Sequence, residues 1–269
     1  MKLSEASAIL NGAGIENARG EARILFSEFA GLKDYELYAG DPDASSPELL
    51  LAIERRKKRE PLQYVLGKCD FYNECYTVTP DCLIPRQDTE ILVDYAVKNL
   101  PAGAHFIDLC TGSGCIAIST LKNTEGTSAL AVDISEAALR VARENAARCG
   151  VCDRIEFLNS DVLGEKIGSG AFAILSNPPY VTPEAYKGLE PEIYHEPREA
   201  FLGGEDGLDF YRRITELYRD AIPREGFIAF EIGYDQGAGI TEIAEKYGLT
   251  VEILKDYSAN DRVAVLRPR

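Results

Sequence analysis

Residues 104–114 read Ala-His-Phe-Ile-Asp-Leu-Cys-Thr-Gly-Ser-Gly, a β-favouring run that ends in a glycine-containing turn. The run predicts a strand over 104–109, followed by a helix over 115–123. Glycines at a strand-to-helix turn let a ligand approach the backbone, where the helix N–H groups point at it. Asp133 ends the next predicted strand, and its carboxylate can accept both hydroxyls of a ribose. We therefore expect a cofactor site at the carboxyl edge of a parallel sheet.

Strands and helices alternate from residue 104 onward, which is typical of a mostly parallel sheet covered on both faces. The last two strands have only the segment 255–261 between them, so we expect them to pair as an antiparallel hairpin at one edge. We therefore expect a sheet of seven strands, one of which runs in the reverse direction. The predicted strands are 104–109, 128–133, 154–158, 171–176, 226–232, 249–254 and 262–266, and the predicted helices are 115–123, 135–148, 207–222 and 236–247.

The first 66 residues predict a small helical domain. One amphipathic helix covers 22–32, and Ser46-Pro47-Glu48 is an N-cap with proline at the first helical position, opening a helix over 49–59. Residues 67–85 are β-favouring around Phe71-Tyr72, Tyr76 to Thr79 and Leu83-Ile84, and they predict a β-hairpin connector. The catalytic domain then covers 86–269, beginning with a helix from Asp88.

The predicted strand 171–176 leads directly into Asn177, Pro178, Pro179 and Tyr180. The prolines fix their own φ, lack N–H groups and push the preceding residue toward extended geometry. The result is a rigid corner that presents carbonyl acceptors, the Asn177 amide and the Tyr180 ring. An isolated Asn-Pro-Pro favours a tight strand-exit turn. Beside a cofactor loop, it suits a site that holds a planar nitrogen group against an electrophile.

The glycine loop by itself leaves two kinds of cofactor open. Gly112-x-Gly114-x-x-Ala117 with an acid about twenty residues later also satisfies the dinucleotide fingerprint, so an NAD dehydrogenase is a rival. The reversed hairpin and the Asn-Pro-Pro-Tyr corner weigh against it, and Asp108 is well placed for the ammonium of an amino-acid moiety. Asp161 suits an adenine amino group, with a turn residue as the alternative interpretation.

Composition restricts the partners. A net charge of −15 disfavours nucleic acid, since phosphate binding normally needs a basic surface. The basic stretch 55–59 could touch phosphate, but we favour its interpretation as the solvated end of a helix. The N-terminus lacks a signal-peptide core and no apolar run is long enough to span a membrane, so we expect a cytoplasmic protein. Seven cysteines and two histidines show no metal-ligand spacing, although Cys149 and Cys152 have redox spacing, so no metal is expected.

Together these segments resemble the bacterial protein-(glutamine-N5) methyltransferases that modify peptide chain release factors. Asn-Pro-Pro-Tyr alone is shared with adenine-N6 DNA and RNA methyltransferases, which remain the alternative. Its combination with the helical N-terminus and Ile84-Pro85-Arg86 is far more specific. The resemblance covers almost the whole chain and is carried by 60–67, 83–90, 108–114, 133–135 with 138–139, 176–180, 196–198 with 203–209, 231–233 and 261–263.

The resemblance implies an α/β fold of the Rossmann-like class I S-adenosylmethionine-dependent methyltransferases. It has a seven-stranded sheet with one antiparallel edge strand, plus a small helical domain that recognises the substrate. The implied reaction is N5-methylation of the glutamine side chain in the Gly-Gly-Gln motif of class 1 release factors, yielding S-adenosylhomocysteine. We expect a monomer that binds neither DNA nor membranes. The implied cofactor-binding residues are Asp108, Cys110, Thr111, Gly112, Ser113, Gly114, Asp133, Asp161, Val162 and Asn177.

The same resemblance assigns the catalytic roles to Asn177, Pro178 and Tyr180, and substrate binding to Asn177 through Tyr180, Pro179 included. The Asn177 side-chain oxygen and the Pro178 carbonyl would accept the two hydrogens of the substrate amide, while the Tyr180 ring packs along the side chain. Segment 181–206 is long enough to form a substrate-facing flap, with a surface excursion as the alternative. A non-catalytic module that binds release factors or ribosomes through residues 1–66 is a further rival.

Two departures from the family pattern stand out. The family usually has glycine at the position of Cys110, whose side chain could tighten the methionine pocket. The usual Pro-Arg-Pro-Glu-Thr-Glu appears as Pro85-Arg86-Gln87-Asp88-Thr89-Glu90. Arg86 and Glu90 are retained, and either a mutual salt bridge or a direct catalytic role fits them.

Overall fold

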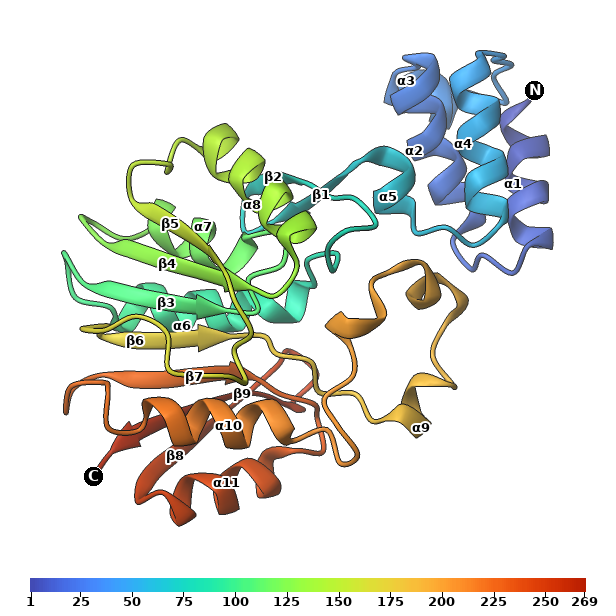
Figure 1. Cartoon of the computed structure of the whole chain (residues 1–269). Helices are drawn as coiled ribbons and strands as arrows, with labels where there is room; N and C mark the ends of the chain where they lie inside the picture. The colour runs from blue at the N-terminus through green and yellow to red at the C-terminus, as the bar shows by residue number, and fades with distance from the viewer. The chain divides into compact units, whose positions relative to one another are not determined.

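A seven-stranded sheet forms the centre of the larger of two units into which the chain folds (Figure 1). The computed structural model describes all residues, 1–269. The strand order is β5-β4-β3-β6-β7-β9-β8, so the order reverses between β3 and β6. Leu109 of β3 pairs with Ser176 of β6, which brings the loops after these two strands side by side. The strands are β3 (His105–Leu109), β4 (Ser128–Asp133), β5 (Ile155–Asn159), β6 (Ala173–Ser176), β7 (Phe227–Glu231), β8 (Leu249–Lys255) and β9 (Asp261–Pro268).

The expected seven strands with one reversed strand are confirmed. The reversed strand is β9, which pairs antiparallel with both β7 and β8 and therefore lies one place inside the edge. The outermost strand is β8. The side chains explain this order, because Val263 to Leu266 are buried on both faces, whereas β8 alternates buried and solvent-facing positions such as Thr250 and Glu252. A run that is apolar on both sides needs neighbours on both sides.

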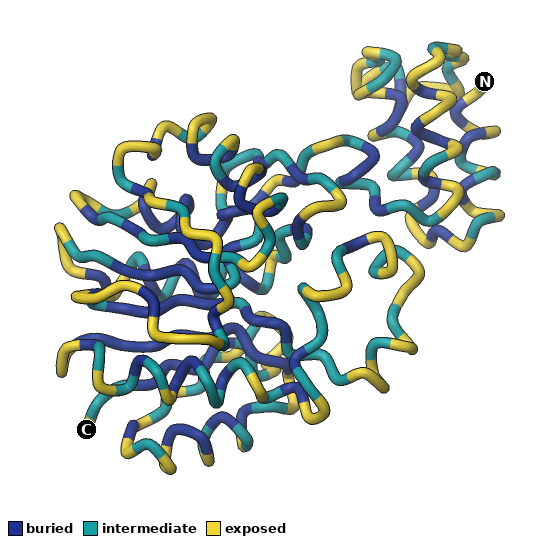
Figure 2. The backbone as a smooth tube through the Cα atoms, viewed as in Figure 1, coloured by how far each residue is buried: buried dark blue, intermediate teal, exposed yellow.

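Helices cover both faces of the sheet. One face packs its alternate residues, such as Phe106 and Phe227, against α6 (Glu90–Asn99), α7 (Cys115–Lys122) and α8 (Glu136–Cys149). The other face packs residues such as Ile107 and Phe230 against α10 (Asp209–Tyr218) and α11 (Gly237–Lys246). Figure 2 shows that burial is concentrated in the strands between these layers. None of the helices combines the length and apolar character that a membrane crossing requires.

The smaller unit is helical and contains Met1–Cys69 together with Glu190–His195. Its core includes Leu10, Phe26 and Ile53. The predicted N-cap is confirmed, since the Leu49 amide donates to Ser46 Oγ at 3.1 Å. The elements are α1 (Leu3–Gly12), α2 (Ala18–Ala30), α3 (Asp34–Ala39), α4 (Pro47–Lys57), α5 (Leu62–Leu66) and the 3₁₀ helix η2 (Pro191–His195).

The basic stretch at the end of α4 is only partly the solvated helix end that we expected, since Lys57 and Lys58 are exposed but the arginines are not. Arg56 is only 5% exposed, and its guanidinium donates to Glu21 Oε2 at 2.5 Å and to Glu192 Oε1 at 2.8 Å. Arg59 pairs with the other oxygen of Glu192 at 2.6 Å, and Arg55 pairs with Glu60. These guanidiniums therefore hold the helical unit together, and η2 belongs to that unit because it supplies Glu192.

After α5 in the chain, β1 (Lys68–Phe71) and β2 (Glu74–Thr77) form a separate two-stranded sheet. Its turn residues Tyr72 and Asn73 have φ of 48° and 62°, as a two-residue hairpin requires. The expectation that Leu83 and Ile84 belong to the hairpin is wrong. The Ile84 amide donates to the buried Glu196 carboxylate at 2.9 Å instead of to a strand. Residues Gln87–Thr89 then form the 3₁₀ helix η1 that precedes α6.

Candidate functional site

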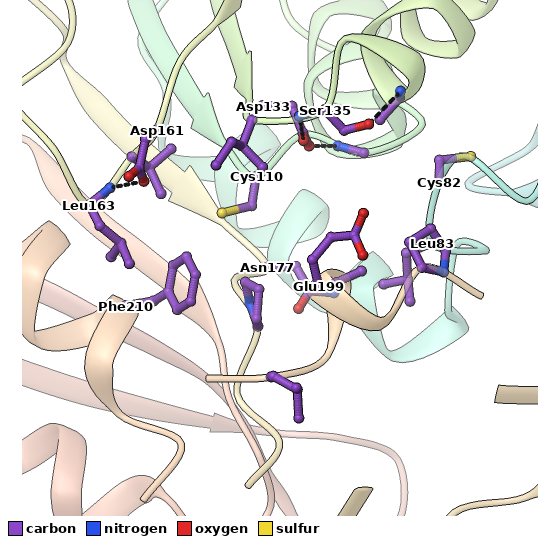
Figure 3. A pocket seen from close by; sticks show the side chains of 18 of the residues that line it. Cys82, Leu83, Cys110, Asp133, Ser135, Asp161, Leu163, Asn177, Glu199 and Phe210 are labelled. Atoms are coloured by element: carbon purple, nitrogen blue, oxygen red, sulfur yellow. Dashed lines mark hydrogen bonds between the residues drawn. The ribbon is translucent and has the colours of Figure 1, made fainter. Parts of the chain in front are cut away.

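A cavity of about 550 Å³ opens at the carboxyl edge of the sheet, and all of its lining belongs to the larger unit (Figure 3). This volume is in the range of small-molecule sites. The loops after β3, β4, β5 and β6 contribute to the wall, together with residues from 81–83 and 197–210. No group of His, Cys, Asp or Glu side chains is arranged to hold a metal ion.

The charged side chains that line the cavity are all acidic. Five carboxylates line it, and no lysine, arginine or histidine does. Such a wall favours a cationic occupant and disfavours phosphate, because a pyrophosphate needs cationic or backbone N–H partners to offset its charge. It therefore argues against the dinucleotide interpretation of the glycine loop. The carboxylates are Asp81, Asp133, Asp161, Glu199 and Asp209.

The loop after β3 makes a tight turn at Cys110. Cys110 has φ of +62°, a left-handed conformation that costs a non-glycine residue roughly 1–2 kcal/mol. This backbone geometry explains why glycine suits the position. The Cys110 side chain points into the cavity toward Asn177 and Phe210 (Figure 3). Burial raises the pKa of the Cys110 thiol, so it presents a neutral, apolar surface at pH 7.

Asp108 lies beneath this loop and is fully buried. Its Oδ2 accepts from the Thr111 hydroxyl at 2.5 Å and from the Ala117 amide at 3.3 Å, whereas Oδ1 is buried without a partner. Burial raises the pKa of Asp108 to about 7. Asp108 does not line the cavity, so its contact with a ligand ammonium stays a prediction. The unsatisfied Oδ1 is nevertheless an acceptor that fits a cationic donor nearby.

Asp133, at the end of β4, lines the cavity directly. Its Oδ2 accepts from the Gly112 amide at 2.8 Å and its Oδ1 from the Ser135 amide at 2.9 Å. Each oxygen keeps a second acceptor position, because a carboxylate has about four lone-pair sites. Burial raises the pKa of Asp133, against the lowering effect of these two amides. The geometry fits the two hydroxyls of a ribose.

The loop after β5 places Asp161 and Val162 at the other end of the cavity. Asp161 Oδ1 accepts from the Leu163 amide at 2.9 Å, which makes Asp161 a turn residue as well as a lining residue. Val162 is 5% exposed and packs into the core below α10. The turn interpretation of Asp161 is therefore confirmed, and its contact with an adenine amino group stays a prediction.

Asn177 and Pro179 of the Asn-Pro-Pro-Tyr corner line the cavity, and Pro178 and Tyr180 do not. The Tyr180 hydroxyl donates to Glu231 Oε1 at 3.4 Å, and the Tyr180 carbonyl accepts from Gln236 Nε2 at 3.2 Å. The chain at Gly203 and Gly207 packs directly against this corner. A Cβ on Gly207 would lie 2.3 Å from the Tyr180 oxygen, so only glycine allows the approach.

Three further residues of the predicted cofactor set also point away from the cavity. Thr111 turns down to Asp108, and the Ser113 carbonyl accepts from Asn145 Nδ2 at 2.9 Å. Gly114 has φ of +82° and packs against Ile118 and Ala142. These three residues shape the loop, and of its residues only Cys110 and Gly112 line the cavity.

Comparison with known proteins places the chain among its relatives. Residues 2–67 match the PrmC N-terminal domain family and residues 87–199 match the Methyltransferase small domain family. A release factor glutamine methyltransferase of Thermodesulfovibrio yellowstonii is 39% identical over 92% of this chain and 91% of its own length. The enzyme of the same name from Moorella thermoacetica is 37% identical over 97% and 95%. The chain belongs to the release factor glutamine methyltransferase family. The resemblance that the motifs indicated is thereby confirmed.

A solved structure supports the fold of this family member. The hMettl16 catalytic domain, solved with hairpin 6 of the MAT2A 3′UTR, superposes with a TM-score of 0.59 over 91% of both chains at 15% identity. At that identity the likeness concerns the fold alone. It agrees with the class I methyltransferase sheet that the family resemblance implied.

The Pro-Arg-Gln-Asp-Thr-Glu segment of this family member makes different pairs from those we considered. Arg86 forms a salt bridge with the buried Glu196, not with Glu90. Glu90 instead accepts from the Tyr72 amide at 2.8 Å, and Asp88 pairs with Arg262 at 3.3 Å. The expectation of a mutual Arg86–Glu90 salt bridge is therefore wrong. The aspartate at position 88 still reaches an arginine.

Sequence reasoning gave no role to several residues that surround the site. Leu83, Glu199 and Phe210 line the cavity, and Thr89 and Glu231 lie behind Asn177. All five lie in or next to segments that carry the family resemblance. Their place in or beside these segments could have marked them as candidate site residues, but the sequence alone did not show which way each side chain points.

Segment 181–206 is divided between the two units. Residues Glu190–His195 belong to the helical unit, where Glu192 pairs with Arg56 and Arg59. Pro197 to Gly204 belong to the catalytic unit and supply part of the cavity wall, and Val181 pairs with Leu202 at the base. The segment therefore lines the site, as a flap must. Whether it contacts the substrate stays a prediction.

Proposed function

We propose that this protein transfers a methyl group from S-adenosylmethionine to the side-chain nitrogen of the glutamine in the Gly-Gly-Gln motif of class 1 peptide chain release factors. The observation that carries the proposal is the Asn177 amide, which faces a cavity lined by five carboxylates and no basic side chain. Membership of the release factor glutamine methyltransferase family supports the choice of substrate.

The acidic cavity fits S-adenosylmethionine, whose sulfonium and ammonium are both cationic. Asp133 would bind the ribose hydroxyls, Asp161 the adenine amino group, and Cys110 and Gly112 the methionine portion. Asp108 Oδ1, two residues before Cys110 in the chain, is a buried acceptor without a partner and would be available to the ammonium. When bound, the cofactor supplies an electrophilic methyl group. No metal takes part in the proposed reaction.

The corner solves the chemical problem of the reaction, because an amide nitrogen is a poor nucleophile. The Asn177 side-chain oxygen and the Pro178 carbonyl would accept the two amide hydrogens, which orients the nitrogen toward the methyl group. Orientation of this kind supplies on the order of 7–11 kcal/mol in intramolecular reactions. Acceptors aimed at the positive charge that develops on nitrogen add to it. The proton can leave after methyl transfer, so no strong base is required.

We assign substrate recognition to the helical domain, residues 1–66. Nucleic acid is disfavoured as the substrate, because Arg55, Arg56 and Arg59 of the basic stretch are already engaged by carboxylates within the helical unit. We further infer a cytoplasmic monomer that does not bind DNA. The deciding experiment incubates the protein with methyl-labelled cofactor and, separately, a release factor or DNA. Label on a Gly-Gly-Gln peptide supports the proposal, and label on DNA or on neither overturns it.

Replacing Asp133 by asparagine is expected to weaken S-adenosylhomocysteine binding by about 10-fold or more. An asparagine has one acceptor oxygen, so its NH₂ group would face either the Gly112 or the Ser135 amide, donor against donor. Isothermal titration calorimetry measures the change. The matched control is Glu165→Gln, an exposed acid in the loop after β5, which should leave the affinity unchanged. Equal affinity of Asp133→Asn and wild type would contradict the assigned ribose site.

A further inference from the structure

We propose that Thr89 and Glu231 are positioning residues that hold the Asn177 amide in the orientation needed for methyl transfer. The inference rests on the proposed function, because it concerns the group that would contact the substrate glutamine. The contacts run from Glu231, at the end of β7, through the Thr89 hydroxyl to Asn177, at the end of β6.

The chain of hydrogen bonds has a direction. Glu231 and Thr89 are each 2% exposed, and the Thr89 hydroxyl donates its only proton to Glu231 Oε2. Thr89 Oγ1 can then only accept from Asn177, and the atom it meets, at 3.4 Å, is Nδ2. The Asn177 oxygen is therefore turned to the opposite side. That oxygen is the atom that must accept from the substrate amide.

The three residues come from elements that fix their spacing. Strands β6 and β7 are paired, with Ser176 opposite Phe230, so Asn177 and Glu231 follow adjacent positions. Thr89 ends the 3₁₀ helix η1, which is attached to β9 by the Asp88–Arg262 pair at 3.3 Å. A rotated Asn177 amide would place oxygen against oxygen at Thr89 and present NH₂ to the NH₂ of the substrate.

The direction depends on Glu231 being a carboxylate. The groups that face it are Arg262 of β9, Asp88 of η1, Tyr180 after β6, and Tyr211 of α10, whose hydroxyl donates to the Glu231 carbonyl at 3.0 Å. Burial raises the pKa of Glu231 to about 7. Below that pH the protonated acid can donate to Thr89, which frees the Thr89 proton to donate to Asn177 and reverses the chain. The active form is the deprotonated one, so kcat should fall as pH drops through about 7.

The test is Thr89→Val, which keeps the shape of the side chain and removes its hydroxyl. Methylation of a purified release factor should show kcat lowered by about 10- to 100-fold, with KM and the Kd of S-adenosylhomocysteine within about twofold. Thr89→Ser should restore kcat to within about threefold, because it keeps the hydroxyl. The acid limb of kcat near pH 7 should be present in wild type and absent in Thr89→Val. The control is Thr215→Val in α10. The Thr215 hydroxyl is buried and has no hydrogen-bond partner, so the kcat and pH profile of this variant should match those of wild type.

The outcomes separate this inference from the proposed function. If Asn177→Ala loses activity but Thr89→Val keeps the wild-type kcat, the positioning role is overturned. The proposed function is then left intact. Full activity of Asn177→Ala overturns the positioning role together with the role assigned to Asn177, whereas a wild-type protein that does not methylate a release factor overturns the proposed function. If Thr89→Val folds poorly, Thr89→Ser decides the matter by comparison with wild type. A kcat within about threefold of wild type supports the role of the hydroxyl, and a loss of about 10-fold or more in a stably folded Thr89→Ser overturns it.

Discussion

Alanine at position 177 is expected to abolish glutamine methylation, lowering kcat by about 10³-fold, while the affinity for S-adenosylhomocysteine changes by no more than about threefold. The Asn177 oxygen would be one of two acceptors for the substrate amide, and the Pro178 carbonyl alone cannot fix the orientation of the nitrogen. In the proposed site, cofactor binding would rest mainly on other residues that line the cavity, such as Asp133 and Asp161. Single-turnover methylation of a purified release factor measures the first quantity, and calorimetry the second.

The control for this variant is Asn99→Ala, at the end of α6, where the side chain donates to the Tyr95 carbonyl at 2.8 Å. It removes the same amide away from the cavity and should leave kcat unchanged. Turnover of Asn177→Ala equal to wild type would sink the mechanism. A loss of cofactor affinity as large as the loss of kcat would mean that Asn177 serves the cofactor alone.

The second large effect concerns stability. Arg56→Ala should lower the free energy of unfolding of the helical unit by about 3–5 kcal/mol, because it leaves Glu21 and Glu192 without the guanidinium that pairs with both. The Arg56 side chain is 6% exposed and each glutamate side chain 16% exposed, so water compensates little. Hydrogen exchange should show faster exchange of amides throughout 1–69 and 190–195.

The neighbouring Lys57 provides the comparison. Its pair with Glu54 is 3.4 Å long, and the two side chains are 50% and 55% exposed, so Lys57→Ala should change the unfolding free energy by less than about 1 kcal/mol. Equal effects of the two variants would show that burial of the Arg56 network does not govern the stability of this unit.

The sheet could be predicted from the sequence because its strands are short apolar runs at regular spacing. The position of β9 inside the edge could not be read from chain order, since it depends on which of two adjacent strands finds neighbours on both sides. Site residues could be predicted where they lie at the end of a predicted strand, as Asp133 and Asn177 do. Thr89 and Glu231 were not foreseen as a pair, because 142 positions separate them and only the folded sheet brings them together.

Arg56 shows the same limit in the helical unit. Its sequence neighbours are basic, so local reasoning favours a solvated surface. The carboxylate that completes its environment comes from residue 192, far along the chain. Long-range pairing of this kind leaves no periodic pattern in the sequence.

The placement of Glu190–His195 in the helical unit has a consequence for how this protein can be divided. A fragment that stops at Cys69 lacks Glu192, and its Arg56 and Arg59 lose a carboxylate that both require. The unit is therefore not a single N-terminal cassette. Any fragment or chimera meant to keep this chain's own arginine–glutamate network has to carry both segments, 1–69 and 190–195.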